Sequence, residues 1–298
     1  MTDLEQLHFT GTVWRPPYES YSILLQITVG CTHHACKFCT LYGDLRFRKS
    51  PIEEIEADLR IIALHQPRAR RVFLTGANPF VLSYNRLVQL ADRIRDFLPK
   101  VRTIGMFARI TDIANKSDEE LHELHARGIT GLTIGTETGD EASLAFMNKG
   151  YTATNILEQC HRLDAAGIEY YLTYMTGLAG AGNGQRAAHA TANLYNQLHP
   201  YIIGIVSLTL FPEAPLTADV KTGKFREAGE HERLEELRTF IVELNIPTTI
   251  MGHTVSNTVP LLGHLPEDRA RLLHELDEAL ARLSEEKLSD YRRRITHL

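Results

Sequence analysis

Three of the four cysteines in this chain, Cys31, Cys36 and Cys39, lie within nine residues of one another in the segment GCTHHACKFCTLY. A disulfide framework spreads paired cysteines through a small secreted chain, whereas clustered thiols are typical of metal sites. The spacing C-x4-C-x2-C lets three thiolates of one loop bind one metal centre. Two interpretations stay open: a structural zinc whose fourth ligand is His33, His34 or a remote side chain, and an iron–sulfur cluster with one open iron.

The fourth cysteine, Cys160, lies in a helical pattern beside Ile156, Leu157 and Leu163. A free cysteine in such a position behaves as a small apolar side chain, and we expect an inert core thiol. With one thiol left outside the cluster, the chain cannot build a second iron–sulfur site.

The elements that must position these cysteines alternate along the chain. Short apolar and β-branched runs predict strands, and the longer stretches between them have helical periodicity. The predicted strands are 22–29, 71–75, 102–110, 129–137, 169–177 and 202–211. We therefore predict an α/β fold, a partial (β/α)6 TIM-like barrel of about residues 20–212, followed by a C-terminal helical extension over about 213–298. No composition break marks a second domain, so we expect a single domain over 1–298.

Each unusual group of residues directly follows a predicted strand. The cysteines come after the first strand, and the later strands are followed by TGANPF (75–80), Arg109, TETGD (136–140) and GLAGAGNG (177–184). Active sites of parallel barrels are built from the loops at the carboxyl ends of the strands. The sequence therefore predicts that these loops form one site.

The alternation of side chains along two strands predicts a polar interior. Gly105 and Phe107 share one face of the third strand, and Thr133, Gly135 and Glu137 share one face of the fourth. A small and polar inner face favours a lumen that holds a ligand. Residues 248–264 have no clear period, and we expect a loop that closes over the barrel, with His253, Ser256 and Asn257 as candidate contacts.

Composition narrows the class of protein. The 298 residues carry 32 basic and 37 acidic side chains, a formal charge of −5, which argues against a general nucleic-acid binder. No run of 18 apolar residues predicts a membrane span, and the acidic start MTDLEQLHFTG is unlike a signal peptide. We expect a cytoplasmic protein with a small-molecule substrate.

The cysteine segment resembles the signature of the radical SAM superfamily, C-x3-C-x2-C with an aromatic residue before the last cysteine. CTHHACKFC has Phe38 in that position, and its first gap is one residue longer. The segment with Gly76, Ala77 and Asn78 is similar to the family's Gly-Gly-Glu-Pro segment, which binds the amino group of S-adenosylmethionine (SAM).

The resemblance extends from about residue 10 to about residue 290. IGTETGDEASLAFMNKGYT, with Glu137 and Thr138, is similar to a segment of methylthiotransferases and oxygen-independent coproporphyrinogen oxidases. YMTGLAGAG resembles the glycine-bearing fifth strand that packs on the adenine. The resemblance implies that the three cysteines bind one 4Fe–4S cluster. It also implies SAM contacts from Gly76, Ala77, Asn78, Arg109, Glu137, Thr138 and Gly177.

The resemblance further implies that SAM is cleaved reductively and that the 5′-deoxyadenosyl radical removes hydrogen from a small molecule. A low-potential electron donor of the flavodoxin or ferredoxin type would be a partner, and no nucleic acid is expected. The alternatives are an enzyme that modifies tRNA or protein, a non-catalytic zinc-binding barrel, and transfer of the aminocarboxypropyl group of SAM. Nothing in the sequence names the substrate.

Overall fold

The computed structural model describes residues 7–43 and 45–296. Eight strands form one sheet in the order β1-β4-β5-β6-β7-β8-β9-β10. Their bounds are β1 Ile23–Gln26, β4 Arg71–Thr75, β5 Thr103–Ala108, β6 Ile129–Glu137, β7 Tyr170–Thr176, β8 Ile202–Ser207, β9 Thr248–Met251 and β10 Leu262–Leu265. The pairs β1/β4, β4/β5, β5/β6, β7/β8 and β8/β9 are parallel, and β10 is antiparallel to β9.

Helices alternate with the first six strands of this sheet. They are α1 Ile52–His65, α2 Tyr84–Phe97, α3 Ile110–Ala114, α4 Asp118–Ala126, α5 Glu141–Phe146, α6 Ala153–Ala166 and α7 Gly184–Tyr195. This confirms the predicted α/β class and the strand–helix connectivity of a partial (β/α)6 barrel. The first predicted strand is split: β1 joins the large sheet, and β2 (Thr28–Val29) pairs with β3 (Arg48–Lys49) in a separate two-stranded sheet.

The chain divides into two compact units, each assembled from separate stretches of sequence. Unit 1 comprises Met1–His34, Leu41–Ile134 and His161–Tyr170, and unit 2 comprises Ala35–Thr40, Gly135–Cys160 and Tyr171–Leu298. Strands β6 and β7 contribute residues to both units. The single domain expected from the sequence stays a prediction.

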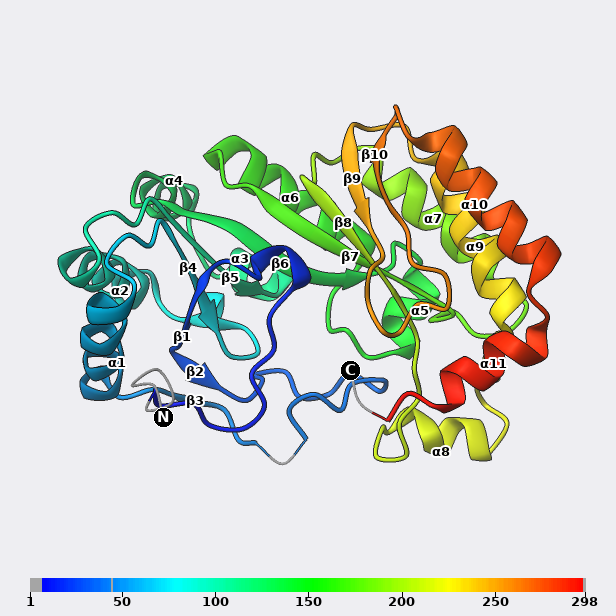
Figure 1. Cartoon of the computed structure of the whole chain (residues 1–298), viewed down its shortest axis with the longest axis horizontal. Helices are drawn as coiled ribbons and strands as arrows, with labels where there is room; N and C mark the ends of the chain where they lie inside the picture. The colour runs from blue at the N-terminus through cyan, green and yellow to red at the C-terminus, as the bar shows by residue number, and fades with distance from the viewer. Residues whose placement is uncertain (1–6, 44, 297–298) are drawn as a thin grey trace. The chain divides into compact units, whose positions relative to one another are not determined.

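In unit 1, helices α1, α2 and α4 form the layer shown in Figure 1, with α2 in contact with both of the others. Apolar residues spaced at helical period turn one face of α2 inward, and Leu87, Leu90 and Ile94 are buried. In β5, Ile104 and Met106 are fully buried while Phe107 is only half-buried. The predicted alternation of side chains along this strand is therefore confirmed.

A 3-10 turn near the N-terminus, η2 (Pro17–Glu19), fills part of the polar face of unit 1. The Arg71 guanidinium donates to both carboxylate oxygens of Glu19, which is 1% exposed. An added Cβ at Gly105 or at Gly131 would lie 2.4 Å from the Arg71 Nη2 atom. The glycines on this part of the inner face therefore make room for an ion pair of the protein itself, where the sequence predicted space for a ligand.

Unit 2 adds helices α8 Leu216–Lys221, α9 Glu230–Glu243, α10 Arg269–Arg282 and α11 Glu285–Arg293. Helix α9 contacts both α7 and α10, and Figure 1 shows the three helices running side by side. Cys160 is fully buried, as expected for a core thiol. Within the described residues, no helix is both long enough and apolar enough to span a membrane.

The segment 248–264, expected to be a closing loop, instead contains strands β9 and β10. Asn257 is 6% exposed, and its amide donates to the carbonyls of Ile205 and Gly252 at 2.8 Å each. Ser256 accepts the backbone N–H of Ser207 at 3.2 Å. These two polar residues therefore hold the hairpin against β8, and strands of four residues are too short to give a periodic signal in the sequence.

We predict that Gly131→Ala destabilises the protein more than Gly223→Ala does. Both glycines have left-handed φ angles, +76° and +72°, so alanine at either position costs about 1–2 kcal/mol of backbone strain. An added Cβ at Gly223 meets open space, whereas at Gly131 it meets Arg71 and disturbs the pair with Glu19. Denaturant unfolding measures both losses, and equal losses would show that the Arg71 contact contributes nothing.

Candidate active site

The first cysteine of the cluster segment belongs to unit 1 and follows β2 through Gly30. Gly30 has a φ of +73°, and an added Cβ would lie 2.6 Å from the Leu45 carbonyl oxygen. This close approach requires glycine. The turn places Cys31, which is half-buried, directly before Thr32, whose backbone N–H donates to the side chain of Asn78 at 3.3 Å.

The other two cysteines, Cys36 and Cys39, form a turn in unit 2, in which the Cys39 N–H donates to the Cys36 carbonyl at 3.2 Å. Lys37, between them, donates its N–H to Met147 and accepts the N–H of Leu216. Its ammonium also pairs with Asp219 at 2.8 Å. Backbone and charge contacts on two sides therefore fix this turn.

Phe38 anchors the same turn in the core of unit 2. It packs against a cluster of buried apolar side chains formed by Met147, Leu178, Leu208, Leu216 and Phe225. The packing of Phe38 against this cluster thus explains an aromatic residue before the last cysteine. Next to the partly buried Phe38 ring, Cys36 is half-buried and Cys39 is exposed.

The donor set fits an iron–sulfur cluster. All three thiols are free of disulfides and at least partly accessible. In the part of the chain that the structure describes, no three His, Cys, Asp or Glu side chains gather around a single metal ion. The thiolates of a cuboidal cluster each bind a different iron atom, so they surround the cluster at larger separations than the ligands of a single ion.

In unit 1, the loop after β4 carries Gly76, Ala77 and Asn78. Gly76 has a φ of +128°, and an added Cβ would lie 2.1 Å from the Thr28 hydroxyl. That hydroxyl is buried and has no hydrogen-bond partner among the described residues. Buried polar atoms without partners are rare, and this one lies directly beneath the backbone of the loop after β4.

Asn78 connects this loop to two others. Its amide donates to the Thr32 hydroxyl at 2.8 Å and to both carboxylate oxygens of Asp112 at 3.1 and 3.2 Å. Asp112 also accepts the backbone N–H of Arg109 at 2.9 Å, which caps the start of α3. Burial raises the pKa of the Asp112 carboxyl, and burial lowers the pKa of nearby Lys116 to about 8.

Glu137, at the end of β6, has a left-handed backbone with a φ of +67°. A non-glycine residue in this region costs about 1–3 kcal/mol and is typical of functional sites. Its carboxylate accepts from the Lys149 ammonium at 3.3 Å and from the Thr173 hydroxyl at 2.8 Å. Lys149 donates as well to the Gly135 carbonyl at 2.8 Å. These contacts within unit 2 hold Glu137 in its strained conformation.

The next residue, Thr138, is 1% exposed and holds the turn that follows. Its hydroxyl accepts the Asp140 N–H and shares a hydrogen bond with the Thr191 hydroxyl, both at 3.1 Å. An added Cβ at Gly139 would lie 2.8 Å from the Thr191 Cα atom. The turn is therefore packed directly on α7.

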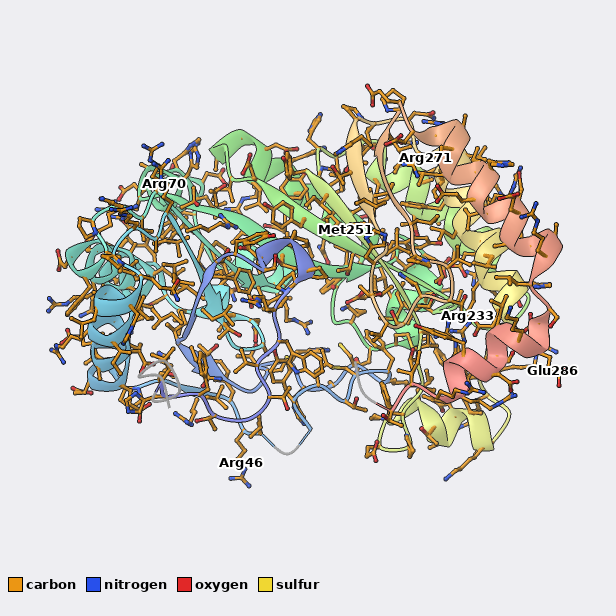
Figure 2. The ribbon with its side chains drawn as sticks, in the orientation of Figure 1. Arg46, Arg70, Arg233, Met251, Arg271 and Glu286 are labelled. Atoms are coloured by element: carbon orange, nitrogen blue, oxygen red, sulfur yellow. The ribbon has the colours of Figure 1, made fainter. Side chains whose placement is uncertain are left out.

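Gly177 begins the loop after β7, with a φ of +77°. Its N–H donates at 2.8 Å to Glu236, a fully buried carboxyl on α9 that also accepts the Tyr174 hydroxyl at 2.8 Å. Burial raises the pKa of Glu236 to about 7. Arg233, labelled in Figure 2, comes from the same helix, and its Nε atom lies 2.9 Å from where a Cβ at Gly177 would be.

Unit 2 also contains a cavity of about 700 Å³ next to the carboxyl end of β8. Residues 209–213 form one wall, and the first turn of α9 and the helix α11 form the others. The side chains of Arg292 and Glu230 make a bidentate ion pair at this cavity, one bond of which is 2.8 Å long. The cavity volume lies within the range of small-molecule pockets.

The structure places Cys31, Gly76, Ala77, Asn78 and Arg109 in strand-end loops of unit 1. It places Glu137 at the end of β6, and Cys36, Cys39, Thr138 and Gly177 in loops of unit 2. Their roles as ligands stay predictions. Sequence reasoning missed Asp112, Thr173 and Glu236, which hold these loops, and it included Lys149 only as part of the Lys-Gly in the segment that resembles the family. Among the three missed residues, a signal existed for Asp112, which stands three residues after Arg109 at the spacing of a helix cap.

A strand–helix fold with a three-cysteine loop after its first strand defines a class of SAM-dependent iron–sulfur proteins. The family model of the radical SAM superfamily matches residues 25–190, more than half of the chain. The protein belongs to the radical SAM superfamily. Members of this family use a 4Fe–4S cluster and SAM.

One curated relative is the heme chaperone HemW of Bacillus subtilis, 25% identical over 154 residues, which are 49% of this chain and 40% of HemW. This chain therefore spans less than half the length of that relative. Methylornithine synthase (PylB) has a similar fold, with a TM-score of 0.55 and 15% identity over 86% of this chain and 68% of PylB. Coproporphyrinogen III oxidase (HemN) of Escherichia coli has a TM-score of 0.54 and 15% identity, over 75% of this chain and 52% of HemN.

We predict that the buried carboxyl of Glu236 makes stability depend on pH. The folded protein keeps this proton up to about pH 7, whereas a glutamate in the unfolded chain has its ordinary pKa of 4.5. The free energy of unfolding therefore falls between pH 4.5 and 7, by about 3 kcal/mol from this group. Denaturant unfolding of the apoprotein at several pH values measures this fall in the free energy of unfolding. Glu236→Gln is the comparison, because the glutamine side chain does not titrate. Parallel pH profiles for the two proteins would contradict the prediction.

Proposed function

We propose that the protein is a radical SAM enzyme that removes hydrogen from a small-molecule substrate. Cys31, Cys36 and Cys39 bind the 4Fe–4S cluster in this proposal, and the strand-end loops bind SAM. The observation that carries it is the cysteine loop itself. Its three thiols are disulfide-free and accessible, and the loop lies inside the segment that the family model matches.

With the three cysteines holding the cluster, the cluster and SAM would supply radical chemistry for removing hydrogen from a substrate. The residues of the chain itself bind and orient SAM and the substrate. In our proposal Glu137 accepts from the hydroxyl or ammonium groups of SAM, since each carboxylate oxygen can accept more than one hydrogen bond. Arg109 pairs with the carboxylate of SAM or of an acidic substrate. Gly76, Ala77, Asn78, Thr138 and Gly177 shape the loops that approach the cofactor.

The cavity of unit 2 supports a small-molecule substrate. Its volume of about 700 Å³ is suited to one, and it borders the carboxyl end of β8, where parallel-strand proteins bind their substrates. Reductive cleavage of SAM also requires an electron from outside the chain. We propose a low-potential donor of the flavodoxin or ferredoxin type as the partner.

Heme binding is a second candidate function. It is favoured by the match to a relative that is named as a heme chaperone. Two measurements on the reconstituted protein separate heme binding from SAM cleavage. One is a titration with heme that is monitored by absorption spectroscopy, and the other is an assay for 5′-deoxyadenosine. Stoichiometric heme binding without formation of 5′-deoxyadenosine favours the chaperone function, and formation of 5′-deoxyadenosine without heme binding favours the enzyme.

We predict that Cys36→Ala abolishes formation of 5′-deoxyadenosine and lowers the iron content, because one iron loses its thiolate. Circular dichroism should show an unchanged fold, since Cys36 is only half-buried and makes no disulfide. The matched control is Cys160→Ala, which changes the same residue type in the core. The control should keep its iron and activity while losing about 1 kcal/mol of stability. Full activity of Cys36→Ala would refute ligation by this residue.

Analysis of the metal and of the SAM products tests the remaining alternatives. After anaerobic purification, a 4Fe–4S protein contains iron and acid-labile sulfide, whereas the zinc-binding alternative contains one zinc and no sulfide. Methylthioadenosine in place of 5′-deoxyadenosine would identify transfer of the aminocarboxypropyl group. Salt-dependent retention of RNA would favour a tRNA-modifying enzyme instead of one acting on a small molecule.

A further inference from the structure

One buried carboxylate, that of Asp112, holds two strand-end loops of unit 1 at once. It is 2% exposed, accepts the N–H of Arg109 at 2.9 Å, and accepts the Asn78 amide at 3.1 and 3.2 Å. Capping the short helix α3 requires only the first of these bonds. The second bond ties the loop after β4 to the start of α3.

Asn78 extends this connection to the cysteine loop. It is 1% exposed, donates to the Thr32 hydroxyl at 2.8 Å and accepts the Thr32 N–H at 3.3 Å. Thr32 directly follows Cys31 in the sequence. Two hydrogen bonds in opposite directions fix both the position and the orientation of the backbone beside this cysteine.

Lys116 supports the same loop from the other side. Its ammonium donates to the Phe80 carbonyl at 2.6 Å and to the Asp112 carbonyl at 3.2 Å, and the residue is 5% exposed. A buried carboxylate is costly unless it is hydrogen-bonded and has an opposite charge nearby. Lys116 provides that charge, so the network is complete within unit 1.

We propose that Asp112 is a positioning residue for the cofactors, which acts through Asn78 on the loop of Cys31 and through the backbone of Arg109 on the start of α3. The inference rests on the proposed function, because it assumes that these loops bind the cluster and SAM. Groups that orient metal ligands change metal affinity by about 10- to 100-fold when they are removed. We expect changes of this size in cluster retention and in the dissociation constant for SAM.

An exchange of the two side chains tests the proposal. Asn78→Asp places two carboxylates against each other and loses the hydrogen bonds between the two side chains. Asp112→Asn keeps the oxygen that accepts from the Arg109 N–H and the Asn78 amide. It replaces the other acceptor with an amide nitrogen, about 3.2 Å from the Asn78 nitrogen, and it removes the carboxylate charge. In the double variant Asn78→Asp/Asp112→Asn, the carboxylate at position 78 accepts from the N–H and hydroxyl of Thr32. The amide at position 112 donates to that carboxylate and accepts the Arg109 N–H. The double variant therefore restores one hydrogen bond between the two side chains, the contacts to Thr32 and the contact to Arg109.

The measurements are the rate of iron release to a chelator and the SAM dissociation constant from calorimetry, both on reconstituted protein. We expect each single variant to be impaired about 10- to 100-fold and the double variant to lie near wild type. Single variants like wild type, or a double variant as impaired as the worse single one, would overturn the inference.

Asp58→Asn is the matched control, because Asp58 is also a carboxylate of unit 1 with 2% exposure. It accepts the His8 backbone N–H at 3.0 Å and contacts the His8 ring at 2.7 Å. We expect it to lower the unfolding midpoint of the apoprotein while leaving iron release and SAM affinity unchanged. An equal effect of Asp58→Asn on the cofactors would show that Asp112 acts only through general stability.

The wild-type protein distinguishes failure of this inference from failure of the proposed function. If wild type takes up no cluster, or takes one up and does not bind SAM, the proposed function is overturned, and this inference with it. If wild type binds both and the variants match it, only the positioning role of Asp112 is overturned.

Discussion

Buried polar side chains hold the backbone of the strand-end loops, and the arrangement of the candidate site depends on these contacts. Asp112 and Asn78 secure the loop after β4, and the carboxyl of Glu236 secures Gly177 after β7. Burying such groups costs free energy unless their hydrogen bonds are made, and in each of these loops they are made. In return the loops adopt conformations that backbone preference alone disfavours, such as the left-handed φ of Glu137.

The same contacts separate residues that hold the site from residues available to a ligand. Asn78 and Thr138 stand where the family resemblance suggests SAM contacts, yet both side chains are almost fully buried and bonded within their own unit. Arg109 is held through its backbone N–H, so its guanidinium is not needed for this contact. A loop can therefore keep the shape that is typical of the family while one of its side chains holds the backbone of the loop instead of contacting the ligand.

The polar face of unit 1 shows a similar division between two parts of the strands. Near the amino ends of β4 and β6, Gly131 accommodates the ion pair of Arg71 and Glu19. Near the carboxyl ends lie the loops with chemical groups, as is usual for parallel strands. Small and polar residues on an inner face can therefore surround an ion pair of the protein or a bound ligand. The residue types alone do not distinguish these two cases.

The sequence by itself determined the order of strands and helices, the placement of the cysteines after the first strand, and the family to which the chain belongs. Apolar periodicity and a short local motif carry this information, because both depend on neighbours within a few residues. The tertiary structure alone decided which groups hold the loops. Asn78 and Asp112 are 34 positions apart and Gly177 and Glu236 are 59 apart, and no local pattern links partners at such separations. It also decided that residues 248–264 contain paired strands, since β9 pairs with β8 and β10 pairs with β9, and neither strand has a period of its own.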